Sequence, residues 1–161
     1  MIVSSFPQGL SGKSSGRGSN PLFHESYRRT TVTGQTPDYG GFMRYVDGYV
    51  LPVPRKNLQA YGRMARKAGK IWREHGALEF RECTGDDLDV KGMVTFPRRI
   101  RLKRGETVVF SWIVFKSRAH RDRVNAKVMK DPRLAKMMDV KSIPFDSKRM
   151  VYGGFKVLVD A

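Results

Sequence analysis

The chain contains 161 residues, of which 40% are hydrophobic and 11% aromatic, and this length and composition suit one folded domain with a tail. Its 31 basic and 15 acidic side chains leave a net charge of +16, which predicts attraction to polyanions but does not indicate a fold. The single cysteine excludes a disulfide framework and a multi-cysteine zinc site, and no apolar run approaches the ~20 residues of a membrane span, so we expect a cytoplasmic domain.

The composition changes near residue 42. Residues 1–42 hold seven of the 16 glycines together with seven serines, and they show neither a helical nor a strand period. Such residues offer little side-chain area to offset the cost of ordering the backbone, so we predict a disordered extension and a folded domain over residues 43–161. Two alternatives stay open for the extension, namely a transit peptide and translation that begins at Met43.

Two elements stand out at the start of the domain. Residues 45–53 are rich in β-branched and aromatic side chains and end among prolines, which is typical of a strand. Residues 56–75 carry apolar side chains at helical spacing, and Gly76 is a natural stop for that helix. The predicted stripe of this helix consists of Leu58, Tyr61, Ala65, Ala68, Trp72 and His75.

The rest of the domain predicts three more strands and two more helices. We expect the strands at residues 77–83, 107–115 and 150–159, with a bulge or a close approach of backbones at Gly153 and Gly154. Ser117 is expected to cap a helix over residues 118–130, and Asp131 with Pro132 to open a short helix that ends at Met138.

This order of elements predicts the fold class. The order β-α-β-β-α-β is that of the α+β ferredoxin-like fold, in which two helices cover one face of an antiparallel four-stranded sheet. The strands at 45–53 and 107–115 are apolar on both sides, so the face without helices needs a cover as well. A second copy packed sheet against sheet is the simplest cover, and we therefore predict a homodimeric α+β barrel.

Several segments of the domain resemble the small bacterial YbaA-like family. They include Tyr-Val-Asp-Gly-Tyr-Val at 45–50, His-Gly-Ala-Leu-Glu at 75–79, Phe-Ser-Trp-Ile at 110–113, and the segments 116–122, 144–146 and 152–155. The resemblance spans residues 43–161, and it implies a dimer of the dimeric α+β barrel superfamily in which the two sheets face each other. It implies no substrate, because the family is a domain of unknown function, and the sequence does not decide whether the protein is an enzyme.

Polar side chains in the predicted strands indicate a small-molecule site. Asp47 shares one side of its strand with Tyr49, and a buried carboxylate is costly unless it is paired. We predict a chamber between sheet and helices that binds or converts a small molecule, with Asp47 as an acid or base and Arg81 as an anchor for an anion. The expected lining is Asp47, Tyr49, Glu79, Arg81 and Trp112. The alternative is a structural ion pair of Arg81 with Asp47 or Glu79 that holds the dimer in register.

His75 and His120 are the histidines of the domain, and imidazole titrates near neutral pH. His120 is our second candidate for an acid or base, and His75 a candidate for binding the small molecule. The alternative is that His75 stabilises its helix at the C-terminus and that His120 packs on the buried side of its own helix. His75 with Glu79 supplies only two metal ligands, and residues 9–14 lack the spacing of a phosphate loop, so we predict neither a metal nor a cofactor.

A run of basic residues at 97–104 carries the competing hypothesis, a non-enzymatic protein that binds RNA. If the segment is extended, Arg99, Arg101 and Lys103 share one side and can follow a phosphate backbone. The full predicted set is Arg98, Arg99, Arg101, Lys103 and Arg104. No aromatic stacking platform accompanies them, so such binding would be weak and sensitive to salt. Two other interpretations stay open: a solvated edge strand, and a dimer that acts through a protein partner.

Overall fold

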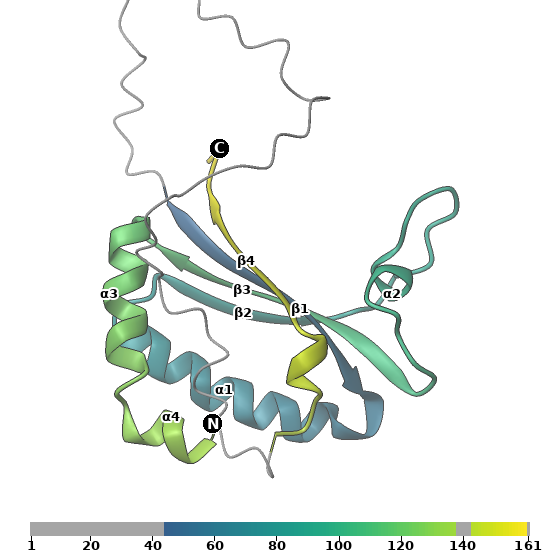
Figure 1. Cartoon of the computed structure of the whole chain (residues 1–161), viewed down its shortest axis with the longest axis horizontal. Coiled ribbons are helices and arrows are strands. Elements are labelled where there is room, and N and C mark those ends of the chain that lie inside the picture. Colours follow the sequence, from purple (N-terminus) through teal and green to yellow (C-terminus); the bar gives the residue numbers. More distant parts are fainter. Residues whose placement is uncertain (1–43, 138–142, 161) are drawn as a thin grey trace, which may run out of the picture.

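The computed structural model describes residues 44–137 and 143–160. The predictions for residues 1–42, for Met43 and for Met138 lie outside this part of the chain. The elements, drawn in Figure 1, are β1 (Tyr45–Pro54), the 3-10 helix η2 (Arg55–Asn57), α1 (Leu58–Glu74), β2 (Glu79–Thr84), α2 (Phe96–Arg99), β3 (Glu106–Phe115), α3 (Arg118–Val128), α4 (Pro132–Met137), the 3-10 helix η3 (Ser147–Arg149) and β4 (Val151–Lys156).

The four strands form one antiparallel sheet in the order β2-β3-β1-β4. The first strand of the chain, β1, therefore lies inside the sheet, between β3 and β4. Val46, for example, is opposite Val114 of β3 and Phe155 of β4. The predicted antiparallel four-stranded sheet in a mixed α and β domain is confirmed.

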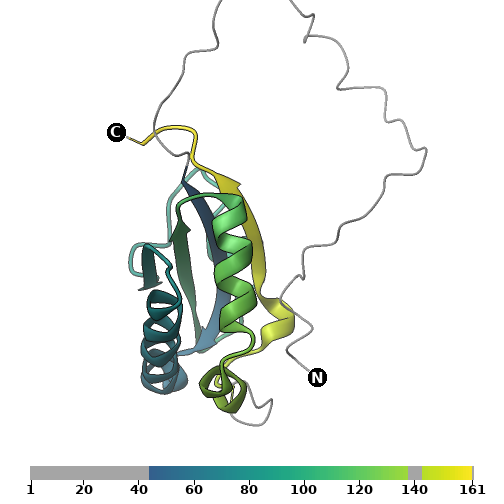
Figure 2. The ribbon, with the colours of Figure 1, turned by 90° about the vertical axis from the view of Figure 1, so that its left-hand side faces the viewer.

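The helices α1, α3 and α4 pack against one face of this sheet (Figures 1 and 2). Alternate residues of β1 and β3 supply the sheet side of the core, since successive strand residues point to opposite faces. The buried hydrophobic residues of this core are Tyr45, Tyr49, Leu51, Val53, Tyr61, Ala65, Ile71, Trp72, Ala77, Val109, Ile113, Phe115, Val124, Val128 and Leu134. The other face, which we call the open face, carries no long helix in the described part of the chain.

The helix α1 follows the predicted apolar stripe. Tyr61, Ala65 and Trp72 are buried against the sheet, while the arginines and lysines between them are exposed. A 3-10 turn occupies residues 55–57, so the α-helix begins two residues later than predicted. Gly76 follows the helix with φ of 113°, a left-handed conformation that costs glycine little, and so ends the helix as expected.

Side-chain caps fix the starts of the helices that follow β3. The Ser117 hydroxyl accepts a hydrogen bond of 3.1 Å from the backbone N–H of His120, which confirms the predicted cap of α3. Asp131 accepts one of 2.9 Å from the N–H of Arg133 at the start of α4. The helix α3 ends at Val128, two residues before the predicted end.

The two glycines of β4 allow aromatic rings to approach the backbone, without a bulge in the strand. The register of β4 against β1 is continuous from residue 151 to 156, so the predicted alternative of a bulge is wrong. A Cβ at Gly153 would lie 3.1 Å from the ring of Phe155, and one at Gly154 would collide with the hydroxyl of Tyr45. Close approach is therefore the correct interpretation of this pair.

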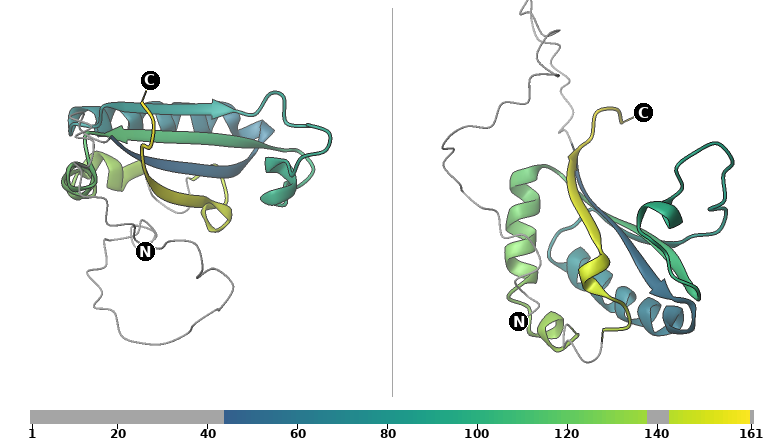
Figure 3. Two further views of the ribbon diagram at one scale, coloured as in Figure 1. Left: turned by 90° about the horizontal axis from the view of Figure 1, so that it is seen from above. Right: turned by 45° about the vertical axis from the view of Figure 1, so that its right-hand side comes forward.

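The basic run at 97–104 is not extended, which corrects the prediction of a charged row on one side of a strand. Residues 96–99 form the short helix α2, opened by a proline in its first turn and closed by Arg101 with φ of 51°. Together with its flanking loops, α2 projects from the ends of β2 and β3, away from α1 and α3 (Figure 3). Arg99, Arg101 and Lys103 therefore do not share one side, and the edge-strand interpretation also fails.

Candidate functional site

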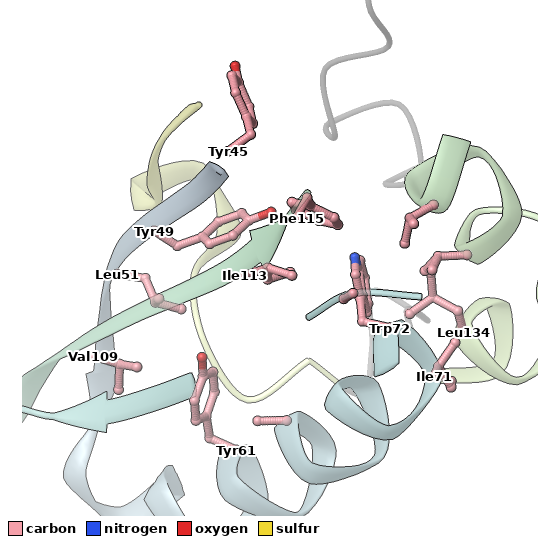
Figure 4. Packing of buried hydrophobic residues seen from close by; sticks show 14 of the residues in the cluster. Tyr45, Tyr49, Leu51, Tyr61, Ile71, Trp72, Val109, Ile113, Phe115 and Leu134 are labelled. Carbon is pink, nitrogen blue, oxygen red and sulfur yellow. The ribbon is translucent and has the colours of Figure 1, made fainter. Parts of the chain in front are cut away.

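A cavity of about 100 Å³ lies between the sheet and the helices. Its wall is mostly apolar, with side chains such as Met64, Trp72 and Met137. Four of its lining residues carry a hydroxyl or carboxyl group: Tyr49, Tyr61, Glu82 and Ser111. In Figure 4 the hydroxyl of Tyr61 points from α1 toward the sheet. We call this cavity the chamber, and it has the mixture of apolar wall and few polar groups that small-molecule sites show.

Glu82 is the titratable group that distinguishes the chamber. The hydroxyl of Tyr61 donates a hydrogen bond of 2.7 Å to its carboxylate. Glu82 belongs to the edge strand and is exposed as a whole residue, yet its carboxylate is directed inward. Burial of the carboxylate raises the pKa of Glu82 to about 7, against the smaller lowering effects of hydrogen bonds from Tyr61 and Ser111. At neutral pH this group can both donate and accept a proton.

The raised pKa of Glu82 predicts a pH dependence of stability. The folded protein holds this proton up to a pH of about 7, while the unfolded chain releases it near 4.5, so this contribution to stability is lost as the pH rises between these values. We expect Glu82→Gln to lack this loss of stability. The free energy of unfolding of the variant, relative to that of wild type, should therefore rise by about 1 kcal/mol from about pH 5 to pH 8, a figure reduced for solvent screening. Urea unfolding measures this, with Glu79→Gln on the opposite face as a charge-matched control. Equal pH slopes in wild type and Glu82→Gln would contradict the assignment.

The structure separates the residues predicted to line the chamber. Tyr49 lines it, and Asp47 is on the same face of β1. Glu79, Arg81 and Trp112 lie on the open face instead, because β2 turns Phe80 and Glu82 toward the helices. The carboxylate of Glu79 lies 3.9 Å from the guanidinium of Arg81. Of the two ion pairs offered as alternatives for Arg81, the structure therefore contains the one with Glu79 and not the one with Asp47.

Asp47 belongs to a buried polar network next to the chamber rather than to its wall. The residue has no exposed surface, and its Oδ1 lies 3.2 Å from the Nε of Arg121. These two atoms are within ion-pair distance but lack hydrogen-bond geometry, so their attraction is electrostatic. The amide of Asn125 donates a hydrogen bond of 3.3 Å to Oδ2 and accepts one of 3.1 Å from the indole of Trp72. Burial raises the pKa of Asp47 despite the nearby Arg121.

The two histidines take structural positions outside the chamber. His75 caps the C-terminus of α1, and its Nε2 lies 2.9 Å from Oδ2 of Asp131. His120 stands in the first turn of α3, where its Nδ1 accepts a hydrogen bond of 3.2 Å from the backbone N–H of Lys116. Partial burial and the nearby cations, Lys116 first among them, lower the pKa of His120. Neither histidine lines the chamber, and their alternative structural roles fit these contacts.

A groove of about 540 Å³ runs along the outer side of α1, between that helix and the edge strand β2. Tyr61, Ala65, Phe80 and Glu82 line both the groove and the chamber, so they form the wall between the two. Two glycines of α1 and three of its basic residues border the groove, namely Gly62, Gly69, Arg66, Lys70 and Arg73.

The two glycines of α1 are expected to respond in opposite ways to alanine. A Cβ at Gly62 meets no atom within 4 Å, so Gly62→Ala gains helix propensity and raises the free energy of unfolding by about 0.5–1 kcal/mol. A Cβ at Gly69 would lie 2.7 Å from the ring of Phe80, so we expect Gly69→Ala to lower it by about 1–3 kcal/mol. Urea unfolding measures the free energy of unfolding of both variants. A Gly69→Ala variant that is more stable than wild type would show that Phe80 does not close the wall between the groove and the chamber.

Among residues 44–137 and 143–160, no three side chains of the types His, Cys, Asp and Glu are grouped so as to hold a metal ion. Within the same residues, no helix has the length and apolar character needed to cross a membrane.

The sheet, its helices and the chamber define an α+β protein with a small, partly polar internal cavity. Residues 44–147 match the family described as "Protein of unknown function (DUF1428)", and the chain belongs to this family. It is 42% identical over 118 residues to the uncharacterized protein YbaA of Escherichia coli K12 and to that of Shigella flexneri, covering 73% of this chain and 99% of each relative. Among solved structures, the de novo designed protein Foldit4 is similar over 73% of this chain and 99% of its own chain, at 9% identity and with a TM-score of 0.36. The predicted relation to the YbaA-like family is confirmed.

Proposed function

We propose that this protein is a cytoplasmic homodimer that binds a small molecule in the chamber between its sheet and helices. The observation that carries the proposal is the Tyr61–Glu82 pair, a hydroxyl and a carboxylate 2.7 Å apart at the wall of a mostly apolar cavity. Glu82 takes the acid or base role that the sequence suggested for Asp47 and His120. The single cysteine, Cys83, is free, which suits a reducing compartment.

The strand order supports a ferredoxin-like domain, and the open face supports a second copy as its cover. Exposed or half-buried apolar side chains form a continuous patch there: Val46, Val50, Phe110, Trp112, Val151 and Phe155. Exposed aromatic surface of this kind marks an interface.

The ion pairs at the rim of the open face are compatible with a copy of the same surface as its cover. Three pairs lie there: Glu79 with Arg81 at 3.9 Å, Glu106 with Arg149 at 2.7 Å and Arg44 with Asp160 at 3.3 Å. The basic helix α2 also adjoins this face, because the ring of Phe96 lies 6.3 Å from that of Phe110. An identical apolar face meets no repulsion from the paired charges at the rim.

Native mass spectrometry of untagged protein, released gently from cells, tests both parts of the proposal. We expect the mass of a dimer with a small adduct, and we expect Ala68→Phe, which fills the chamber wall, to keep the dimer and lose the adduct. Ala60→Phe, on the exposed side of the same helix, is the matched control and should keep the adduct. A monomer would contradict the dimer, and wild-type dimer without an adduct would contradict the ligand. A heavier species that nuclease removes would favour the RNA hypothesis instead.

A further inference from the structure

We propose that the ligand is an amphipathic organic anion, with its charged group in the groove beside Arg66, Lys70 and Arg73 and its apolar part reaching past Phe80 into the chamber. This inference rests on the proposed binding function and adds the class of the ligand. It combines the outer groove, which the chamber hypothesis leaves without a role, with the basic face of α1.

The volumes of the two cavities favour a ligand whose larger part lies in the groove and whose end lies in the chamber. At about 100 Å³, the chamber is smaller than the ~150 Å³ apolar cavity that holds one benzene molecule. At about 540 Å³, the groove falls within the ~300–1,000 Å³ of ordinary ligand pockets. Four residues line both, so the two cavities adjoin across this wall. In the proposed complex a molecule larger than benzene lies with its body in the groove, and its end enters the chamber where the ring of Phe80 moves aside.

Gly62 leaves open space beside the groove, and a glycine at this position costs helix stability. A glycine inside a helix costs about 1 kcal/mol relative to alanine. At Gly69 the close packing of Phe80 explains the glycine, because a Cβ there would lie 2.7 Å from the ring. At Gly62 no atom of the described residues lies within 4 Å of a Cβ, so packing within that part of the chain does not explain the glycine. The space beside Gly62 opens into the groove, where a bound molecule would use it.

The charges that line the groove select an anion. Arg66, Lys70 and Arg73 lie on one side of α1, and Glu82 is the one acidic residue among the described lining residues. Two of these cations already have a partner within the chain. The Nζ of Lys70 lies 4.0 Å from the carboxylate of Glu74, and Arg73 donates a hydrogen bond of 2.9 Å to the carbonyl of Ala77. In the described part of the chain Arg66 has no acidic partner. With a pKa raised to about 7 by burial, Glu82 is partly protonated at neutral pH and repels an anion less.

Octanoate and 1-octanol, matched in chain length, test the inference by titration of ¹⁵N-labelled full-length protein followed by NMR. We expect octanoate to bind at least about tenfold more tightly at low salt, with shifts at the amides of Gly62 and Gly69. The double variant Arg66→Gln/Lys70→Gln should lose that tenfold advantage and leave the affinity for 1-octanol unchanged. Arg63→Gln/Lys67→Gln, which removes the same charge outside the groove, should keep it.

A second variant tests the position of the ligand without changing the charge of the protein. At Gly62 a Cβ meets open space and the residue borders the groove, so Gly62→Leu should stay folded and weaken both octanoate and 1-octanol by about tenfold or more. Equal binding of the acid and the alcohol in wild type would overturn the anionic ligand while leaving the chamber proposal intact. Binding of neither compound, together with no adduct in native mass spectrometry, would overturn the proposed function itself.

Discussion

Replacing Arg121 with methionine is expected to lower the free energy of unfolding at neutral pH by about 3 kcal/mol, at the low end of the ~3–5 kcal/mol measured when one partner of a buried ion pair is removed. The reason is the position of Asp47, which has no exposed surface and depends on Arg121, 12% exposed, as its cationic partner at 3.2 Å. The carboxyl can take up a proton in the variant, which limits the loss. The loss should therefore be smaller at acidic pH and grow as the pH rises.

Urea unfolding, followed by tryptophan fluorescence, measures this effect. Arg123→Met is the matched control, since it removes the same charge from an exposed position of α3 and should change the free energy of unfolding by less than about 0.5 kcal/mol. Adding Asp47→Asn to Arg121→Met should recover part of the loss, because the buried charge is then absent. Similar stabilities of Arg121→Met and Arg123→Met would show that Asp47 does not need its partner.

Phe155→Asp is expected to convert the proposed dimer into a monomer that stays folded. The side chain of Phe155 is 59% exposed in the single chain, so its loss removes little of the core. Its ring covers Gly153 of the edge strand β4 and Gly48 of the neighbouring β1, with a Cβ at Gly48 lying 3.2 Å from it, so it contributes a flat apolar surface to the open face. Truncation of an aromatic anchor of an interface costs ~2 kcal/mol or more, which raises the dissociation constant by about 30-fold, and a buried carboxylate adds to this.

Sedimentation velocity over a range of concentrations measures the dimer, and far-UV circular dichroism reports whether the fold is kept. Gln59→Asp adds the same charge to the exposed start of α1, on the other side of the sheet, and should leave the dimer unchanged. A folded Phe155→Asp that sediments as a dimer would exclude the open face as the interface.

Periodicity in the sequence predicted the main elements because the burial of apolar side chains alone determines their conformation. The stripe of α1 and the β-branched run of β1 each have one arrangement that buries their apolar side chains. The facing of β3 was not predictable from alternation, since both of its sides are apolar, and Trp112 was therefore assigned to the wrong face. In β2 the error was avoidable: Phe80 is its one large apolar residue, and Glu82 shares its side.

The site was predicted only in outline because its decisive contacts join distant parts of the chain. Tyr61 is on α1 and Glu82 on β2, and neither has a spacing that indicates a partner. Arg121, which pairs with Asp47, looks like any other arginine of a basic helix until the helix is placed over the sheet. The extended conformation predicted for the basic run at 97–104 was wrong for another reason. A proline and a residue with left-handed backbone turn the chain there, and these local preferences outweigh the alternation of charges.

The position of β1 inside the sheet has a consequence for the kinetics of folding. Its neighbours are residues 106–115 on one side and 151–156 on the other, so no hairpin of adjacent strands can complete its pairing. Large loops must close first, and the entropy of closing them is lost before the contacts form. We therefore expect folding on the timescale of milliseconds to seconds, with the apolar strand β1 unpaired and prone to aggregation until β3 arrives.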